Sequence, residues 1–131
     1  MNGYIYPAIY HEENNGFWVS FPDFPGVFSR GNTLEETYDN CIEALDLEVS
    51  TRDLNTDPLP HPTQASSIQI SDTDRIVFIR FDINEHKRRI DKHPVKKTLT
   101  IPRWLNELAV EKGINFSATL TQALKEKLGI L

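Results

Sequence analysis

A seven-residue stretch near the end of the sequence, residues 95–101, constrains the fold more than any other feature. Its side chains alternate as those of a β-strand do, with Leu99 and Ile101 on one face and Lys96, Thr98 and Thr100 on the other. A lone strand can neither pair its backbone N–H and C=O groups nor bury its apolar face. The stretch therefore predicts a strand that pairs, most simply with the same strand of a second copy of the chain.

Two helical patterns follow this strand and reach the end of the sequence. Pro102 suits the first turn of a helix, Gly113 is placed to end that helix in a left-handed conformation, and Asn115 is a good N-cap for the next one. A module of residues 95–131 is too small to bury a stable core alone. We therefore expect an obligate homodimer in which two copies interlock around the paired strands.

A two-stranded ribbon with lysine and threonine on its outer face fits the DNA major groove, where such side chains hydrogen-bond base edges. The order strand, helix, glycine turn, helix resembles the ribbon-helix-helix DNA-binding family, whose members form intertwined β-α-α dimers. This resemblance implies that Lys96, Thr98 and Thr100 read bases and that phosphates are bound by Lys97, Asn115, Phe116 and Ser117. Family members often carry a strand arginine and a small hydroxyl residue where Phe116 stands. The alternative is a dimerisation module that never meets DNA.

The first 83 residues predict an α+β domain with the order βββαβ. Alternating apolar residues indicate strands, and Thr33 with Glu36 forms a capping box that opens a long amphipathic helix. The expected strands cover residues 4–10, 17–21, 27–30 and 75–83, with the helix ending near residues 52–55 and at most a short strand at 68–70. Residues 84–94 then form a linker or short solvated helix that Pro94 ends.

Charge divides the sequence as well. Residues 1–83 carry 14 Asp/Glu and 4 Lys/Arg, a net charge of −10, whereas residues 84–131 carry 5 Asp/Glu and 10 Lys/Arg, a net charge of +5. The basic part is suited to phosphates, and the acidic part repels nucleic acid and attracts basic proteins. Acidic helices that are merely solvated would give the same balance.

The motifs of the acidic part resemble those of the HicB antitoxin family. They are the segment Phe17-Trp18-Val19-Ser20-Phe21-Pro22-Asp23-Phe24-Pro25-Gly26, the helix entry Gly31-Asn32-Thr33-Leu34-Glu35-Glu36, and Pro58-Leu59-Pro60. The resemblance implies a partial RNase H-like domain that binds and blocks a small basic RNA-cleaving HicA toxin, and a rear module that represses the shared operon. It implies a bacterial type II toxin-antitoxin pair, and both halves of the chain agree with it.

Within the acidic domain, we expect the toxin to contact aromatic residues outside the core together with the acidic side of the helix. The candidate toxin-binding residues are Trp18, Asp23, Phe24, Phe28, Glu35 and Asp39. The ribbon makes the chain a dimer, and pairing of front domains would make it a tetramer.

The sequence predicts no enzyme, no cofactor and no metal site. The acids do not converge as two-metal nuclease chemistry requires, and His11, His61, His86 and His93 are scattered without ligand spacing, as exposed loop or linker residues are. Lacking a membrane span or a signal peptide pattern, and with the single Cys41, the chain is expected in the cytoplasm. Another reading is a stand-alone regulator whose front domain senses a small ligand.

Overall fold

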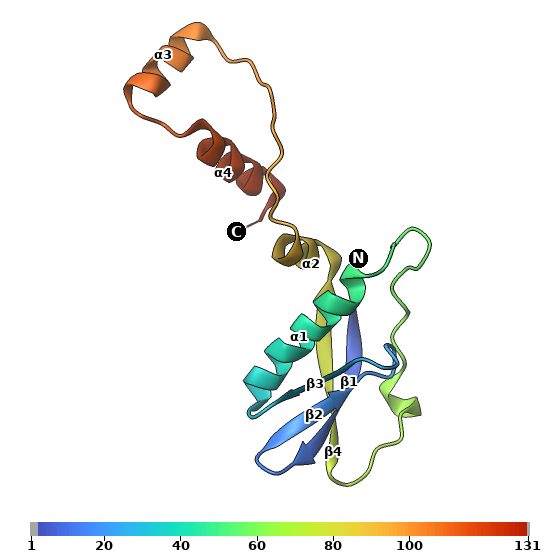
Figure 1. The fold of residues 1–131 in the computed structure, drawn as a ribbon. Helices are drawn as coiled ribbons and strands as arrows, with labels where there is room; N and C mark the ends of the chain where they lie inside the picture. Colours follow the sequence, from blue (N-terminus) through green and yellow to red (C-terminus); the bar gives the residue numbers. More distant parts are fainter. Residues whose placement is uncertain (1–2, 131) are drawn as a thin grey trace. The chain divides into compact units, whose positions relative to one another are not determined.

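The structure is a computed structural model that describes residues 3–130. The chain forms two compact units, a front unit, Met1–His93, and a rear unit, Pro94–Leu131 (Figure 1). The front unit extends to His93 instead of Ile83, because helix α2 (Ile83–Ile90) occupies most of the predicted linker. With this boundary the net charges become −8 for the front unit and +3 for the rear unit. The contrast between the units is therefore smaller than the sequence division indicates, but its sign is kept.

The front unit is built on a four-stranded antiparallel sheet with the order β3-β2-β1-β4. Its elements run β1 (Gly3–Glu13), β2 (Gly16–Ser20), β3 (Phe28–Gly31), α1 (Leu34–Ser50) and β4 (Asp74–Asp82), which confirms the predicted α+β class and βββαβ order. Asn15, at a φ of 62°, makes the left-handed residue of the β1–β2 turn, and Glu13 pairs with Gly16 across it. The likeness of this unit to RNase H stays a prediction.

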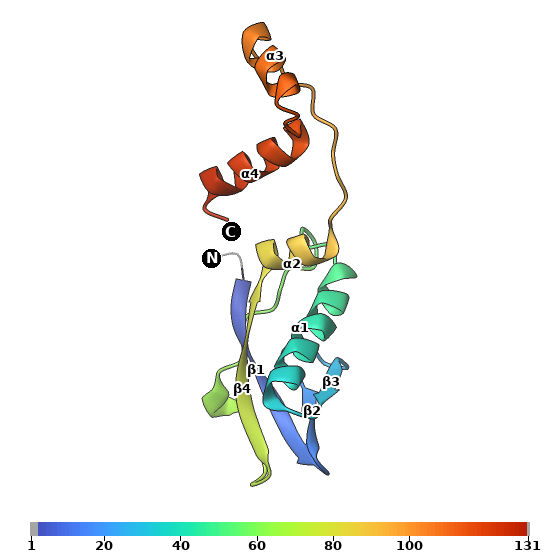
Figure 2. The same cartoon turned by 90° about the vertical axis from the view of Figure 1, so that its left-hand side faces the viewer.

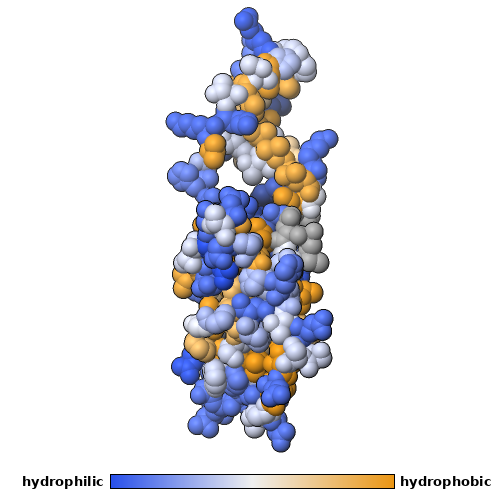
Figure 3. All heavy atoms as spheres, turned by 90° about the vertical axis from the view of Figure 1, so that its right-hand side faces the viewer, coloured by the Kyte–Doolittle hydropathy of each residue, from blue (hydrophilic) through white to orange (hydrophobic). Residues whose placement is uncertain are grey.

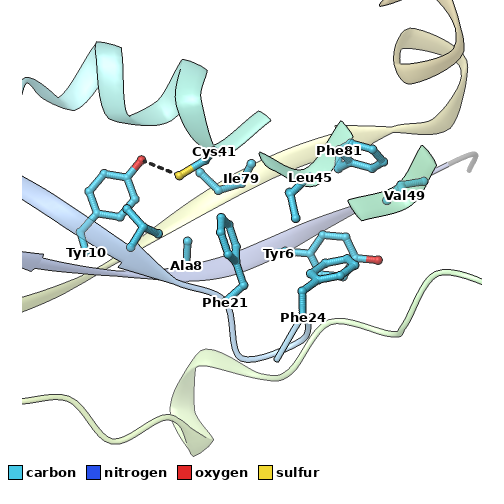
Figure 4. Close-up of a cluster of buried hydrophobic side chains, with 11 residues drawn as sticks. Tyr6, Ala8, Tyr10, Phe21, Phe24, Cys41, Leu45, Val49, Ile79 and Phe81 are labelled. Atoms are coloured by element: carbon cyan, nitrogen blue, oxygen red, sulfur yellow. Dashed lines mark hydrogen bonds between the residues drawn. The ribbon is translucent and has the colours of Figure 1, made fainter. Parts of the chain in front are cut away.

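Helix α1 packs on one face of the sheet and buries the core between them (Figures 2 and 4). Most core side chains come from every second residue of the strands and from one stripe of α1, while two lie in the turn that follows β2. The core residues are Tyr6, Ala8, Tyr10, Val19, Phe21, Phe24, Cys41, Leu45, Val49, Ile79 and Phe81. Burial raises the pKa of the Cys41 thiol to about 11, and its Sγ lies 3.9 Å from Tyr10 Oη. Cys41 is thus a protonated core residue.

The start of α1 is fixed by local chemistry and by a close approach to β3. The Thr33 hydroxyl accepts a hydrogen bond from the Glu36 backbone N–H at 3.1 Å, which confirms the predicted cap. A Cβ at Gly31 would come within 2.7 Å of the Thr37 Cα, so glycine is required where the strand passes under the helix. The edge strand β3 is therefore held tightly against α1.

The connection from α1 to β4 runs along the side of the sheet away from α1 (Figures 1 and 2). It contains a short 3-10 helix, η1 (Ala65–Ser67), and residues 68–70 form no strand, which agrees with the expectation of at most a short one. The Tyr6 hydroxyl donates to the Pro60 carbonyl at 2.7 Å. This bond ties the connection to the core.

Replacing Leu45 by alanine is expected to destabilise the front unit by about 2–5 kcal/mol, because it leaves a cavity in the packed core. Leu45 is fully buried, whereas Leu47, on the same helix, is 72% exposed. Leu47→Ala is the matched control and is expected to change stability by less than about 0.5 kcal/mol. Urea unfolding followed by tryptophan fluorescence measures both values, and equal losses would contradict this assignment of the core.

The rear unit has two helices, α3 (Arg103–Glu111) and α4 (Phe116–Leu128). Gly113 has a φ of +69°, and the Asn115 side chain accepts a hydrogen bond from the Ala118 N–H at 3.0 Å, so both predicted caps are confirmed. None of residues 94–130 is buried in the single chain, and apolar side chains lie open on this unit (Figure 3). Residues 94–102 have no regular secondary structure in the single chain. The predicted strand and homodimer therefore stay predictions.

Candidate functional site

The face of the sheet away from α1 carries an aromatic residue on a fixed platform. The Trp18 indole of β2 stacks on the His11 ring of β1, with centroids 3.7 Å apart and an interplanar angle of 18°. Both ring nitrogens of His11 are held, Nδ1 at 2.9 Å from Asp74 Oδ1 and Nε2 at 2.9 Å from Ser20 Oγ. Trp18 is 37% exposed, so it presents a large surface at little entropic cost on binding.

The Ser20–His11–Asp74 chain has the connectivity of a nucleophile, base and acid. Ser20, however, lies opposite Ile9 of β1 and Phe28 of β3 in the sheet. Its backbone is therefore part of the strand pairing and is not free to bind an oxyanion. The network therefore acts by orienting the imidazole beneath Trp18.

The edge strand β3 extends this aromatic surface. Phe28 is 62% exposed, and its ring centroid lies 6.3 Å from that of Trp18. Together with Ser29 and Arg30 these residues line an open hollow of about 300 Å³. We call Trp18, Phe28, Ser29 and Arg30 the β3-edge surface.

Two of the predicted toxin-binding residues are used inside the front unit. Phe24 is only 1% exposed, with the Tyr6 ring 4.8 Å away on one side and the Arg52 guanidinium 5.3 Å away, so its prediction as a surface residue is wrong. The turn folds Phe24 inward through a hydrogen bond from its N–H to the Phe21 carbonyl. The Asp23 carboxylate accepts from the N–H and hydroxyl of Thr63, at 2.9 and 2.7 Å, and anchors the connection that precedes β4.

Glu35 and Asp39 are exposed on α1, and they lie on the opposite side of the sheet from Trp18. The expected single surface of aromatic and acidic residues is therefore divided by the sheet. The edge strand β3 connects the aromatic side and the acidic side, because Arg30 lines both the β3-edge surface and a second groove. That groove has a volume of about 640 Å³ and is lined by Ser29, Arg30, Asn40, Glu43, Ala44, Asp46, Leu47, Ser50, Arg89 and Ile90.

A buried carboxylate on α1 holds α2 in place. Asp46 Oδ1 accepts from His86 Nδ1 at 2.7 Å and from Arg89 Nη2 at 2.9 Å, and Asp46 Oδ2 accepts from Arg89 Nε at 2.7 Å. Burial favours the neutral carboxyl, but the hydrogen bonds from Arg89 and His86 outweigh it and hold the pKa of Asp46 below its usual range. Asp46 is therefore an ion-paired carboxylate at neutral pH.

The sequence patterns missed this site. Asp46 was not among the candidate residues, and His86 was expected among exposed loop or linker histidines, yet they are 9% and 3% exposed. His11 is also held within a network, whereas His61 and His93 are exposed as predicted. The only sequence signal was that Asp46 falls between the apolar residues Leu45 and Val49 of the buried stripe.

Within residues 3–130, no three His, Cys, Asp or Glu side chains gather as metal ligands would. Over the same residues, no helix combines the length and the apolar character that crossing a membrane requires.

In the rear unit the predicted DNA-binding residues are all exposed. Lys96, Thr98 and Thr100 stand on the irregular segment before α3, while Asn115, Phe116 and Ser117 form the start of α4. Lys97, Phe116 and Ser117 also line a groove of about 610 Å³ whose other apolar residues are Leu99, Ile101, Leu105, Ala109, Ile114, Leu120 and Ala123. We call these apolar residues the rear groove.

The model of a family described as "HicB_like antitoxin of bacterial toxin-antitoxin system" matches residues 6–123, which include most of both units. The chain belongs to the HicB-like antitoxin family. The resemblance seen in the acidic part of the sequence is thereby confirmed, and it extends into the rear unit.

Solved structures support the HicB-like fold over nearly the whole chain. A toxin-antitoxin complex from Streptococcus pneumoniae contains a chain 30% identical in sequence, with a TM-score of 0.55 and coverage of 95% of this chain and 99% of that one. The antitoxin HicB3 is 27% identical with a TM-score of 0.51, covering 98% and 100%. The Burkholderia pseudomallei antitoxin HicB, at 22% identity and a TM-score of 0.52 over 95% and 96%, shares the fold.

One curated relative matches a shorter part of this HicB-like chain. An uncharacterized 14.9 kDa protein of Haemophilus phage HP1, from the rep-hol intergenic region, is 42% identical over 45 residues. The match spans about a third of each protein, 34% of this chain and 34% of the relative.

Proposed function

We propose that this chain is the antitoxin of a HicA/HicB-type toxin-antitoxin pair. Its front unit neutralises a small basic RNA-cleaving toxin by direct contact, and its rear unit, as a dimer, represses the operon of the pair. The observation that carries the proposal is the family match over residues 6–123, which includes most of both units. A structural neighbour that covers almost the whole chain is itself described as part of a toxin-antitoxin complex.

For the front unit, charge and exposed aromatic surface support a basic protein partner. Its net charge of −8 attracts such a partner and repels nucleic acid. The β3-edge surface offers Trp18 on its His11 platform and the exposed ring of Phe28. We propose that the toxin docks on this surface and reaches around the edge strand toward the acidic residues of α1. Phe24 and Asp23 act indirectly, by shaping the turn behind it.

Replacing Phe28 by alanine is expected to weaken toxin binding about 30-fold, as loss of a central aromatic contact typically does. Phe78→Ala is the matched control, since Phe78 is 54% exposed on β4, the edge strand at the other end of the sheet. Isothermal titration calorimetry with the purified toxin measures both. Equal losses, or a loss with Phe78→Ala alone, would place the toxin elsewhere.

For the rear unit, the open rear groove and the positive charge support a DNA-binding dimer. Leu99 and Ile101 of the predicted strand and Leu105 of α3 are 57%, 46% and 42% exposed in the single chain, which is unusual for apolar residues that line one groove. Pairing of two strands over residues 95–101 would bury them and direct Lys96, Thr98 and Thr100 to the outer face. The N-terminal N–H groups of α4 would then be available to a phosphate.

Capture of the partner tests the proposal as a whole. The tagged chain, expressed in its native host, should retain a small basic protein. This protein should cleave RNA when it is free and should not cleave RNA when it is bound to the chain. Front-unit residues 1–93, which contain their own core, should retain the same protein. Failure to bind the product of a neighbouring toxin gene would refute the toxin half of the proposal.

A further inference from the structure

We propose that Asp46 is the positioning residue that holds α2 on α1 and thereby fixes where the tether to the rear unit begins. Its biological meaning rests on the proposed function, since tether length matters only if the rear unit has a partner of its own. The supporting observation is that the Asp46 carboxylate, in a residue only 9% exposed, accepts three hydrogen bonds from α2. The donors are His86 and Arg89, which lie 40 and 43 residues further along the chain.

Helix α2 has little else to keep it folded on the front unit. It has eight residues, fewer than the roughly 12–15 that an isolated helix needs in water. His86 is its one buried residue and lies 5.3 Å from the Phe81 ring, and Ile83 is partly buried. The three consecutive basic residues Lys87, Arg88 and Arg89 are exposed. The attachment of this helix is therefore mainly polar.

The other polar contacts of α2 act only at its start. Asp82 accepts from the Asn84 and Glu85 N–H groups as the N-cap, and Arg80 pairs with Glu85 at 3.0 Å. These bonds join α2 to the end of β4, to which it is already connected covalently. Arg89, in the last turn, bonds across to α1 and fixes the far end of the helix. Without Asp46 the start would remain capped, but the far end would be free.

Release of α2 would lengthen the tether. With α2 docked, the front unit is joined to the predicted strand by residues 91–94, about 11 Å for a flexible chain, using about 5–6 Å times the square root of the residue number. With α2 released, residues 83–94 give about 19 Å by the same rule. A longer flexible tether lowers the effective concentration at which linked sites meet. Asp46 thus sets the length of the flexible tether and, through it, the effective concentration of one unit near the other.

Trypsin tests the docking, because α2 and the tether contain their own cleavage sites. In full-length Asp46→Ala, cleavage after Lys87, Arg88 and Arg89 should be at least 10-fold faster than in the unmodified chain. Cleavage after Lys92, outside α2, should stay within about twofold and serves as the internal reference. Glu43→Ala, which removes an exposed acid from the same helix, is the matched control and should leave all rates unchanged.

A second variant covers the case in which Asp46→Ala unfolds the front unit. Arg89→Gln keeps the buried carboxylate paired with His86, and hydrogen exchange read by mass spectrometry follows α2 without trypsin. We expect faster exchange in α2 and unchanged exchange in α1 and β4. Unchanged protection of α2 in a folded variant would overturn the proposal.

Small-angle X-ray scattering of the full chain tests the tether. The radius of gyration should be larger in Asp46→Ala or Arg89→Gln than in Glu43→Ala. Release of α2 with unchanged scattering would refute the role in tether length. None of these three readouts uses a toxin or DNA, so absence of toxin or operator binding would refute the proposed function and leave these measurements to decide on Asp46.

Discussion

Leu105→Asp is expected to abolish association through the rear unit and to halve the measured mass of the assembly. Leu105 lies on α3 within the rear groove, beside Leu99 and Ile101 of the predicted strand. If two copies close this groove over each other, the new carboxylate is buried without a partner, at a cost of several kcal/mol. A unit of this size has no other core to compensate for the loss. Light scattering coupled to size-exclusion chromatography measures the mass, in multiples of the 15.1 kDa chain.

Val110→Asp is the matched control for this experiment. Val110 stands on the same helix and is 61% exposed, but it does not line the rear groove. This variant should keep the mass of the unmodified chain, and its helical content should be unchanged by circular dichroism. An assembly that persists with Leu105→Asp would show that the rear groove is not the dimer interface.

The parts of this fold that the sequence predicted are those decided by neighbouring residues. Strand alternation predicted the four strands of the front unit and placed Trp18 outside the core. At both caps, the side chains of Thr33 and Asn115 accept hydrogen bonds from N–H groups three residues later, which the residue types alone determine. Such features need no knowledge of what lies across the fold.

The errors concern side chains whose partners are distant in the chain. Phe24 follows Pro22 in a turn that looks exposed, and its burial depends on Arg52 and Tyr6, which approach from other elements. Asp46 and His86 are 40 residues apart, so nothing near either residue indicates the bond between them. Periodicity says that a residue lies on a face but not what covers that face.

The same reasoning explains why the candidate toxin surface was predicted as continuous when the sheet divides it. Alternation placed Trp18 away from the core, and helical spacing placed Glu35 and Asp39 away from the buried stripe. Both statements hold, but the core lies between the sheet and the helix. The outer face of the sheet and the outer face of the helix therefore point in opposite directions. Only the position of the edge strand β3 shows how one partner can contact both sides.

Lys96→Ala combined with Thr98→Ala is expected to weaken operator binding at least about 30-fold. Each good base contact contributes about 1–3 kcal/mol, and a dimer loses every contact twice. Both side chains alternate with the apolar residues of the rear groove, so their removal leaves dimerisation intact. Fluorescence anisotropy with labelled operator DNA measures the affinity at fixed salt concentration. Toxin neutralisation should be unchanged, because the front unit is untouched.

The adjacent lysine provides the control that separates base reading from charge. Lys97→Ala removes the same charge one residue away, on the face that lines the rear groove, where a phosphate contact is proposed. It should weaken binding to operator and to random DNA alike and reduce the salt dependence. Lys96→Ala should instead lower the ratio of operator to random affinity, because only a base-reading side chain distinguishes sequences. If the Lys96 and Thr98 variant loses toxin neutralisation together with operator binding, the strand acts in assembly and not in recognition.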